Sequence, residues 1–195
     1  MHGLINRSIQ CFLGDTYGGD LWSTVAAAAS VPPGGFEAML RYPDATTFAV
    51  LDAATRHLDR PRDSLLEDLG TYLVSNPGFE ALRRLLRFGG ATFVDFLHSL
   101  DELQGRGWLA VPELDLPELD LQEEAAGRYR LLCRSPHPGY GHVMLGILRA
   151  MADDYGALVL LEITALRPGY ESISIDLLET AFAEGRRFDL AGEVT

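Results

Sequence analysis

The chain has 195 residues, of which 47% are hydrophobic and 23% charged, a composition that suits one globular domain with a sizeable core. Its 28 acidic residues exceed its 16 basic residues, and the net charge of −12 repels nucleic acids and anionic membrane surfaces, so neither is expected as a partner. Every basic residue is an arginine, which excludes chemistry that requires a lysine, such as Schiff-base formation or the P-loop phosphate contact.

Apolar residues recur at helical spacing through the first half of the chain. Turn-forming or capping residues separate these apolar segments at TYGGD, PPGG, Asn76-Pro77 and Gly89-Gly90. The pattern predicts helices at residues 4–13, 21–31, 44–58, 64–75 and 78–90. A further helix, TFVDFLHSLDELQ, is expected at 92–104 and is expected to end at Gly105 and Gly107.

The pattern changes to β-branched and alternating residues in the last third of the chain. It predicts strands at 118–124, 127–135, 157–166 and 171–178, with a helix at 143–156 between the second and third strands. We therefore expect a single α+β domain spanning 1–195. It comprises an N-terminal helical lobe of approximately 1–62 and a C-terminal lobe of approximately 63–195, with helices and a four-stranded antiparallel sheet.

Neither the cysteines nor the start of the chain indicates secretion. Cys11 and Cys133 make no disulfide framework, and MHGLINRSIQ lacks the charged region and apolar run of a signal peptide. The longest uncharged apolar stretch, LWSTVAAAASVPPGGF, is broken by prolines and is too weakly hydrophobic to span a bilayer. We expect a cytoplasmic protein without a membrane segment.

Four stretches of the chain resemble elements of one sensor family, in that family's order. MHGLINRSIQCFLGDTYGGDLW is similar to the opening of the heme nitric-oxide/oxygen binding (H-NOX) family, found in soluble guanylate cyclases and bacterial signalling proteins. EDLGTYLV resembles its Leu-Gly-aromatic helix, and FLHSLDELQ resembles its Phe-Leu-x-x-Leu-Asp-x-Leu-His element. CRSPHPGY followed by VMLGILRAMADDYG resembles its Tyr-x-Ser-x-Arg strand and next helix. The resemblance covers nearly the whole chain and implies the H-NOX fold, with a heme pocket between two lobes.

The residues that this resemblance assigns to heme differ from the family pattern. The proximal-histidine position carries Gln104, and the Tyr-x-Ser-x-Arg positions that hold the heme propionates carry Cys133, Ser135 and His137. Pro117 matches the position of a pocket proline. The resemblance therefore implies a cofactor site formed by these five residues, of which three depart from the family.

The departures weaken both of the heme contacts that the resemblance implies. An amide oxygen, as in Gln104, is a poor ligand for ferrous iron compared with an imidazole nitrogen. His98 does not simply take its place, because six residues put it about a third of a helical turn away. A histidine, as in His137, offers at most two donors, whereas arginine binds a carboxylate through a permanently charged fork. We expect that conventional heme binding is weakened or lost, leaving a pocket for another small molecule.

The resemblance implies a sensory or ligand-binding module rather than an enzyme. Because no effector domain is recognised in 195 residues, we expect the signal to pass to a separate cyclase, histidine kinase or chemotaxis receptor. A heme-dependent nitric-oxide sensor with unusual ligation remains an alternative. Another is an enzyme with Cys133 as nucleophile and His137 as base.

Simpler roles are also open for these residues. Gln104 can bond free carbonyls at a helix end, and Cys133 can be a small buried apolar side chain on a strand. Cys133, His137 and His142 carry metal-binding groups at short spacing and could hold zinc, although they match no standard four-ligand pattern.

Overall fold

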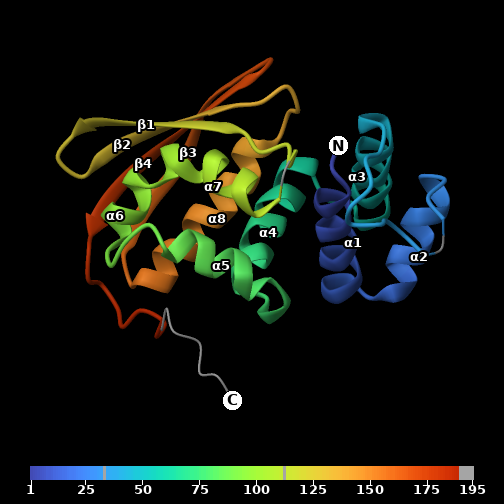
Figure 1. Cartoon of the computed structure of the whole chain (residues 1–195), viewed down its shortest axis with the longest axis horizontal. Coiled ribbons are helices and arrows are strands. Elements are labelled where there is room, and N and C mark those ends of the chain that lie inside the picture. The colour runs from blue at the N-terminus through green and yellow to red at the C-terminus, as the bar shows by residue number, and fades with distance from the viewer. Residues whose placement is uncertain (33, 112, 189–195) are drawn as a thin grey trace. The chain divides into compact units, whose positions relative to one another are not determined.

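The computed structural model describes residues 1–32, 34–111 and 113–188 (Figure 1). The chain divides into two compact units, Met1–Leu65 with Val111–Asp115, and Leu66–Ala110 with the residues from Leu116 onward. The division falls inside one continuous helix, α4 (Arg62–Ser75). Among the described residues, no helix is long and apolar enough to cross a membrane.

The first unit contains three helices, α1 (Gly3–Tyr17), α2 (Gly19–Ala28) and α3 (Asp44–Leu58). A buried hydrogen bond of 2.6 Å from the Thr47 hydroxyl to the Asn6 amide oxygen joins α3 to α1. The segment 113–115 belongs to this unit because Arg41 donates to the Glu113 carbonyl and to both Asp115 carboxylate oxygens. α1 continues past the predicted end of the first helix to Tyr17 and stops at Gly18, whose φ of +95° no longer fits a helix.

The second unit contains the remaining helices and the sheet. The helical elements after α4 are a 3₁₀ turn at Pro77–Phe79, α5 (Glu80–Arg87), α6 (Phe93–His98), a 3₁₀ turn at Leu100–Glu102, α7 (Leu103–Ala110) and α8 (Tyr140–Tyr155). A capping box starts α6, because the Thr92 hydroxyl and the Asp95 carboxylate each accept the other residue's backbone N–H.

Four antiparallel strands form one sheet in the order β1-β2-β4-β3. Their bounds are β1 (Glu118–Ala125), β2 (Arg128–Arg134), β3 (Leu158–Arg167) and β4 (Tyr170–Glu179). Between Ile163 and Ala165 the register of β3 against β4 shifts, which leaves Thr164 as the extra residue of a bulge on β3. β1 and β3 are therefore the two edges of the sheet.

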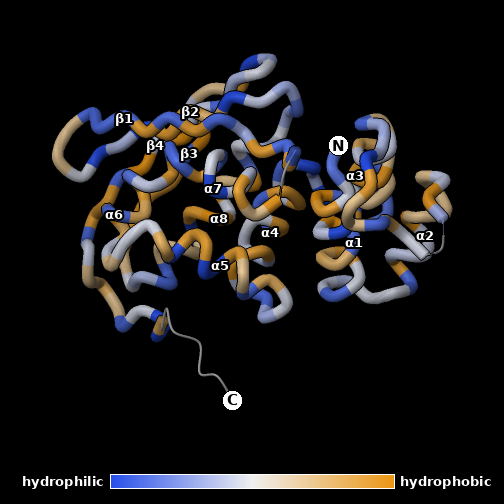
Figure 2. The backbone as a smooth tube through the Cα atoms, viewed as in Figure 1, coloured by the Kyte–Doolittle hydropathy of each residue, from blue (hydrophilic) through white to orange (hydrophobic). Residues whose placement is uncertain are grey.

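α8 supplies much of the core of the second unit, and its apolar residues appear as an orange stretch in Figure 2. It crosses α4 at two glycines. A Cβ atom built on Gly70 would lie 2.0 Å from the Val143 carbonyl oxygen, and one built on Gly146 would lie 2.0 Å from the Glu67 carbonyl oxygen. The helices approach closely only because both positions lack a side chain.

The structure confirms the expected α+β class and the four-stranded antiparallel sheet. The prediction of one helix at 92–104 that ends at Gly105 and Gly107 is wrong, since this segment is divided into α6, a 3₁₀ turn and α7, and α7 runs to Ala110. A glycine inside a helix costs only about 1 kcal/mol, which tertiary packing readily offsets. Here Leu116 packs over Gly107, where a Cβ atom would lie 2.3 Å from its Cδ1 atom.

Candidate functional site

Gln104 lies on α7, after a buried apolar series formed by Phe96, Leu97, Leu100 and Leu103. Its side chain is half-buried, and its amide Nε2 donates a hydrogen bond of 3.1 Å to the carbonyl of Leu116. The amide therefore does bond a backbone carbonyl, but one in the segment before β1 rather than at the end of its own helix. The bond holds α7 to that segment.

Pro117 follows Leu116 directly and is buried at the entry to β1. A second bond joins the same parts of the chain, because the Asp101 carboxylate accepts the backbone N–H of Leu121 at 2.9 Å. The segment that resembles the family's proximal helix is thus attached to β1 through Asp101 and to the residue before Pro117 through Gln104.

His98 is exposed and lies elsewhere. Its ring meets the ring of Tyr129 edge-on, with the ring centroids 6.0 Å apart. The ring of His98 is therefore in contact with a residue of β2.

Cys133, Ser135 and His137, here called the strand trio, line one small cavity of about 10 Å³. Cys133 is fully buried on β2, and the Ser135 hydroxyl accepts the backbone N–H of His137 at 3.1 Å. The structure therefore brings the three residues together. A cavity of this size has room for about one water molecule.

A buried carboxylate from β4 reaches the same cavity. Glu171 pairs with Cys133 across the sheet, is 8% exposed, and accepts the backbone N–H groups of Gly139, at 2.7 Å, and Gly141. These groups form the N-terminus of α8, where unpaired N–H groups and the helix dipole favour an anion. The anion-binding position beside the strand trio is therefore taken by a side chain of the protein itself.

Cys133 is a protonated thiol at neutral pH. Burial, and secondarily the charge of Glu171, raise the pKa of Cys133 to about 12. Because the thiolate is the form that attacks substrates and binds metals, this environment disfavours the nucleophile that the enzyme hypothesis requires. The result fits the simpler interpretation of Cys133 as a small buried side chain.

The zinc hypothesis for Cys133, His137 and His142 is not supported. Among the described residues, no three His, Cys, Asp or Glu side chains group closely enough to hold a metal ion. Nδ1 of His142 lies 3.4 Å from the Glu67 carboxylate, on the side of α8 that faces α4.

These contacts fit a heme group poorly. A propionate at the strand trio would meet the Glu171 carboxylate, and the nearby helix N–H groups already donate to that side chain. At position 104 the amide nitrogen of Gln104 already donates to the carbonyl of Leu116. Arg167, an exposed residue at the end of β3, also lines the cavity and brings a positive charge to it.

Sequence reasoning missed Glu171 and Arg167. A signal for Glu171 was present, because it shares the core-facing side of its strand with Ile173 and Ile175, where a carboxylate is unexpected. No comparable signal marks Arg167, which the turn between β3 and β4 brings to the cavity.

Comparisons with known proteins agree on one family. The family model described as Haem-NO-binding matches residues 2–163. Soluble guanylate cyclase gcy-31 of Caenorhabditis elegans is 25% identical over 154 residues, which cover 79% of this chain and 22% of that protein. Soluble guanylate cyclase 89Da of Drosophila melanogaster is 24% identical over 161 residues, covering 81% and 24%. The chain thus spans less than a quarter of the length of these relatives.

Solved structures give the same fold. An H-NOX protein from S. oneidensis superposes with a TM-score of 0.79 at 15% identity, covering 96% of this chain and all of that one. An oxygen-binding H-NOX domain related to soluble guanylate cyclases gives a TM-score of 0.73 at 15% identity, with 96% and 100% coverage. Since the family model covers most of the sequence and these structures share its fold, the chain belongs to the Haem-NO-binding, or H-NOX, family of sensor domains.

Proposed function

We propose that this chain is a sensory ligand-binding module in which conventional His-ligated heme binding is weakened or lost, and that it signals to a separate effector. One observation carries the proposal. The N–H groups of Gly139 and Gly141, beside the strand trio, serve the internal carboxylate of Glu171, so this position repels a second carboxylate.

The environment of Gln104 supports the same proposal. An amide oxygen is a weak donor to ferrous iron, and the amide of Gln104 is oriented by its bond to the Leu116 carbonyl. Gln104 thus weakens the contact with the iron, and the strand trio beside Glu171 weakens the contact with the propionates. Both changes lower the affinity for heme. A small molecule other than ordinary ferrous heme is the occupant that we expect.

We infer the signalling role from the family to which the chain belongs and not from a contact in the structure. A ligand shifts a sensor only if it binds two arrangements of the protein with different affinity. We expect a cyclase, a histidine kinase or a chemotaxis receptor to detect that shift. Guanylate cyclases are the curated relatives that the chain matches over most of its length.

A hemin titration tests the proposal. Wild-type protein is expected to give no Soret absorption band that saturates at equimolar heme, whereas the double variant Gln104→His/Glu171→Gln is expected to give one. The glutamine keeps an acceptor for the helix N–H groups but removes the charge. His98→Ala is the matched control, because His98 is exposed beside Tyr129 and its removal should leave the double variant's band unchanged.

Native mass spectrometry of the purified wild-type protein then searches for another bound small molecule. A saturating Soret band with reversible nitric-oxide binding in the wild type would contradict the proposal. It would favour the second candidate, a heme-dependent sensor with unusual ligation, for which Arg167 at the cavity of the strand trio is the supporting observation. In that case Arg167→Ala should weaken heme binding measurably.

A further inference from the structure

The outer edge of β3 is an accessible strand edge. β3 is an edge strand of the sheet, and none of its ten residues is fully buried. Within residues 1–32, 34–111 and 113–188, its backbone pairs with β4 alone, so its outward N–H and C=O groups bond no other segment. Such an edge can accept a further strand.

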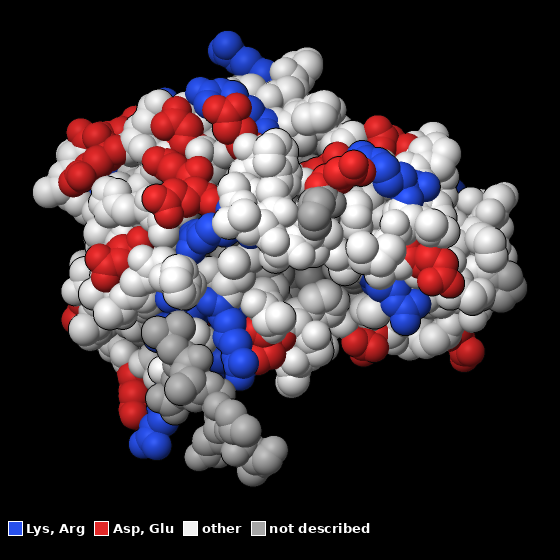
Figure 3. Space-filling model, in the orientation of Figure 1, with Lys and Arg blue, Asp and Glu red and all other residues white. Residues whose placement is uncertain are grey.

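The two edges of the sheet differ in their protection. The β1 edge carries acidic side chains that discourage pairing with another strand, namely Glu118, Asp120, Glu123 and Glu124. Acidic residues gather over the β1–β2 hairpin in Figure 3. The first nine residues of β3, in contrast, include only one charged residue, Glu162. The β3 edge is therefore the one that remains open to an added strand.

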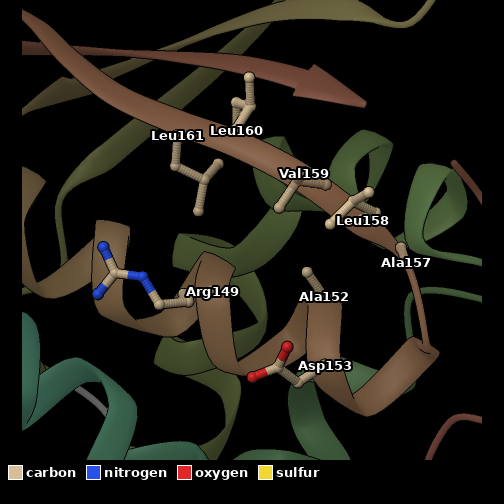
Figure 4. Close-up of a pocket in the computed structure, with 8 residues that line it drawn as sticks. All are labelled: Arg149, Ala152, Asp153, Ala157, Leu158, Val159, Leu160 and Leu161. Carbon is tan, nitrogen blue, oxygen red and sulfur yellow. The ribbon is translucent and has the colours of Figure 1, made fainter. Parts of the chain in front are cut away.

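A hollow of about 160 Å³ lies beside this edge, between α8 and β3. Figure 4 shows Val159 and Leu161 directed toward the helix and Leu160 directed away from it. The apolar residues Ala152 and Ala157 also line the hollow. An apolar cavity of about 150 Å³ can hold a benzene ring, so the hollow has room for one apolar side chain.

The charges around the hollow favour a cationic occupant. Arg149 on its rim is paired with Glu67 at 3.4 Å. Asp153 on the same rim and Glu162 on β3 are exposed, and neither has an ion pair among the described residues. A second copy of the chain would bring the same two carboxylates and a further charge of −12, which disfavours self-pairing.

We propose that the β3 edge and the α8–β3 hollow bind an extended segment of a partner protein in which apolar and basic residues alternate. The segment pairs with β3 as a fifth strand, places one apolar side chain in the hollow, and directs basic side chains toward Glu162. Main-chain bonds to the edge supply affinity, and the hollow supplies specificity. The proposal is independent of which ligand the protein senses.

Fluorescence anisotropy with a labelled seven-residue peptide of alternating valine and lysine tests the proposal. Wild-type protein should bind this peptide, and methylation of alternate peptide amides should weaken binding about tenfold or more because it removes the strand pairing. Glu162→Arg should weaken binding to a similar degree. Glu123→Arg, which makes the same charge change on the β1 edge, should alter it less than about twofold.

Hydrogen exchange provides a second measurement at the site itself. On peptide binding, amides of β3 should exchange more slowly, while amides of β1 should be unaffected. Equal weakening by Glu162→Arg and Glu123→Arg, or equal binding of the methylated peptide, would mean general attraction to an acidic chain and would overturn the proposal. The absence of saturable peptide binding to the wild-type protein would also overturn the proposal. Dimers in sedimentation that Glu162→Arg abolishes would identify a second copy as the occupant instead.

Discussion

The two ends of α8 contrast: one packs against other helices, and the other lies beside residues that depart from the H-NOX pattern expected from the sequence. From Gly146 to Asp154 the residues of the helix make close contact with α4 and α5. Its N-terminus lies beside the strand trio, where two of the three residues differ from the pattern and Glu171 fills the anion-binding position.

The difference shows that packing and ligand contacts are constrained by different physics. At Gly146 a backbone oxygen occupies the space of a side chain, so no other residue fits. At the N-terminus of α8 the N–H groups need only an acceptor, and a side chain of the protein supplies it as well as a ligand does. Substitutions along α8 should therefore have very unequal effects.

The largest effect is expected at the C-terminal end of the helix. Asp154 is 1% exposed, and its Oδ1 accepts a bond of 2.9 Å from Nε of Arg83, while Arg87 lies within ion-pair distance. Asp154→Ala removes the buried carboxylate from both cations, although Arg83 keeps its pair with Glu80, and should lower the free energy of unfolding by about 3–5 kcal/mol, measured by urea denaturation. The neighbouring Asp153→Ala, at an exposed site, should change it by less than about 0.5 kcal/mol. Similar losses in both variants would show that the ion cluster adds little stability.

The helix crossing should give the next largest effect. Gly146→Ala places a Cβ atom against the Glu67 carbonyl and should lower the free energy of unfolding by about 2–3 kcal/mol. Gly14→Ala on α1 is the matched control, because its Cβ atom would meet nothing within 4 Å. That variant should gain up to about 1 kcal/mol from helix propensity. If both variants are stabilised, α4 and α8 do not cross as closely as described.

A pH dependence is expected from Cys133, on β2 beside the start of α8. Burial raises the pKa of Cys133 to about 12, whereas an unfolded cysteine ionises near pH 8.5. Above about pH 9 the unfolded state thus loses a proton that the folded state keeps, which lowers stability by up to about 1.4 kcal/mol per pH unit. The stability difference between wild type and Cys133→Ala should shrink accordingly as pH rises. A constant difference would contradict the burial of a protonated thiol.

The smallest effect is expected on α7. Gln104→Ala removes the bond to the Leu116 carbonyl and should cost about 1 kcal/mol of unfolding free energy. Gln122→Ala removes an exposed bond to Asp120 and should cost almost nothing. A neutral Gln104→Ala would mean that the amide does not hold α7 to the approach of β1.

Local pattern was sufficient to predict most of the fold. Alternation identified the four strands, and the pattern of the sequence predicted both ends of α3, although its N-cap is Pro43, with no side-chain capping bond. The extent of α7 was not predictable, because a glycine costs a helix only about 1 kcal/mol, which contacts with other segments, such as Leu116 over Gly107, can offset. Tertiary contact decided that boundary.

The candidate site was predictable only in part. The family resemblance selected Gln104 and the strand trio, and the trio does line one cavity. The partners that complete these contacts, Leu116 and Glu171, come from other elements. No spacing within one helix or strand encodes such pairings, although a carboxylate in line with Ile173 was a sign that β4 carried an unusual residue.

The bulge at Thr164 limits how much of β3 another strand can follow. The longest regular run of β3 against β4 extends from Val159 to Ile163, and beyond the bulge the side chains exchange faces. At about 3.3 Å per residue, that leaves an uninterrupted template of roughly 16 Å. An interface built on this edge is consequently short, which favours reversible, transient association over a permanent assembly.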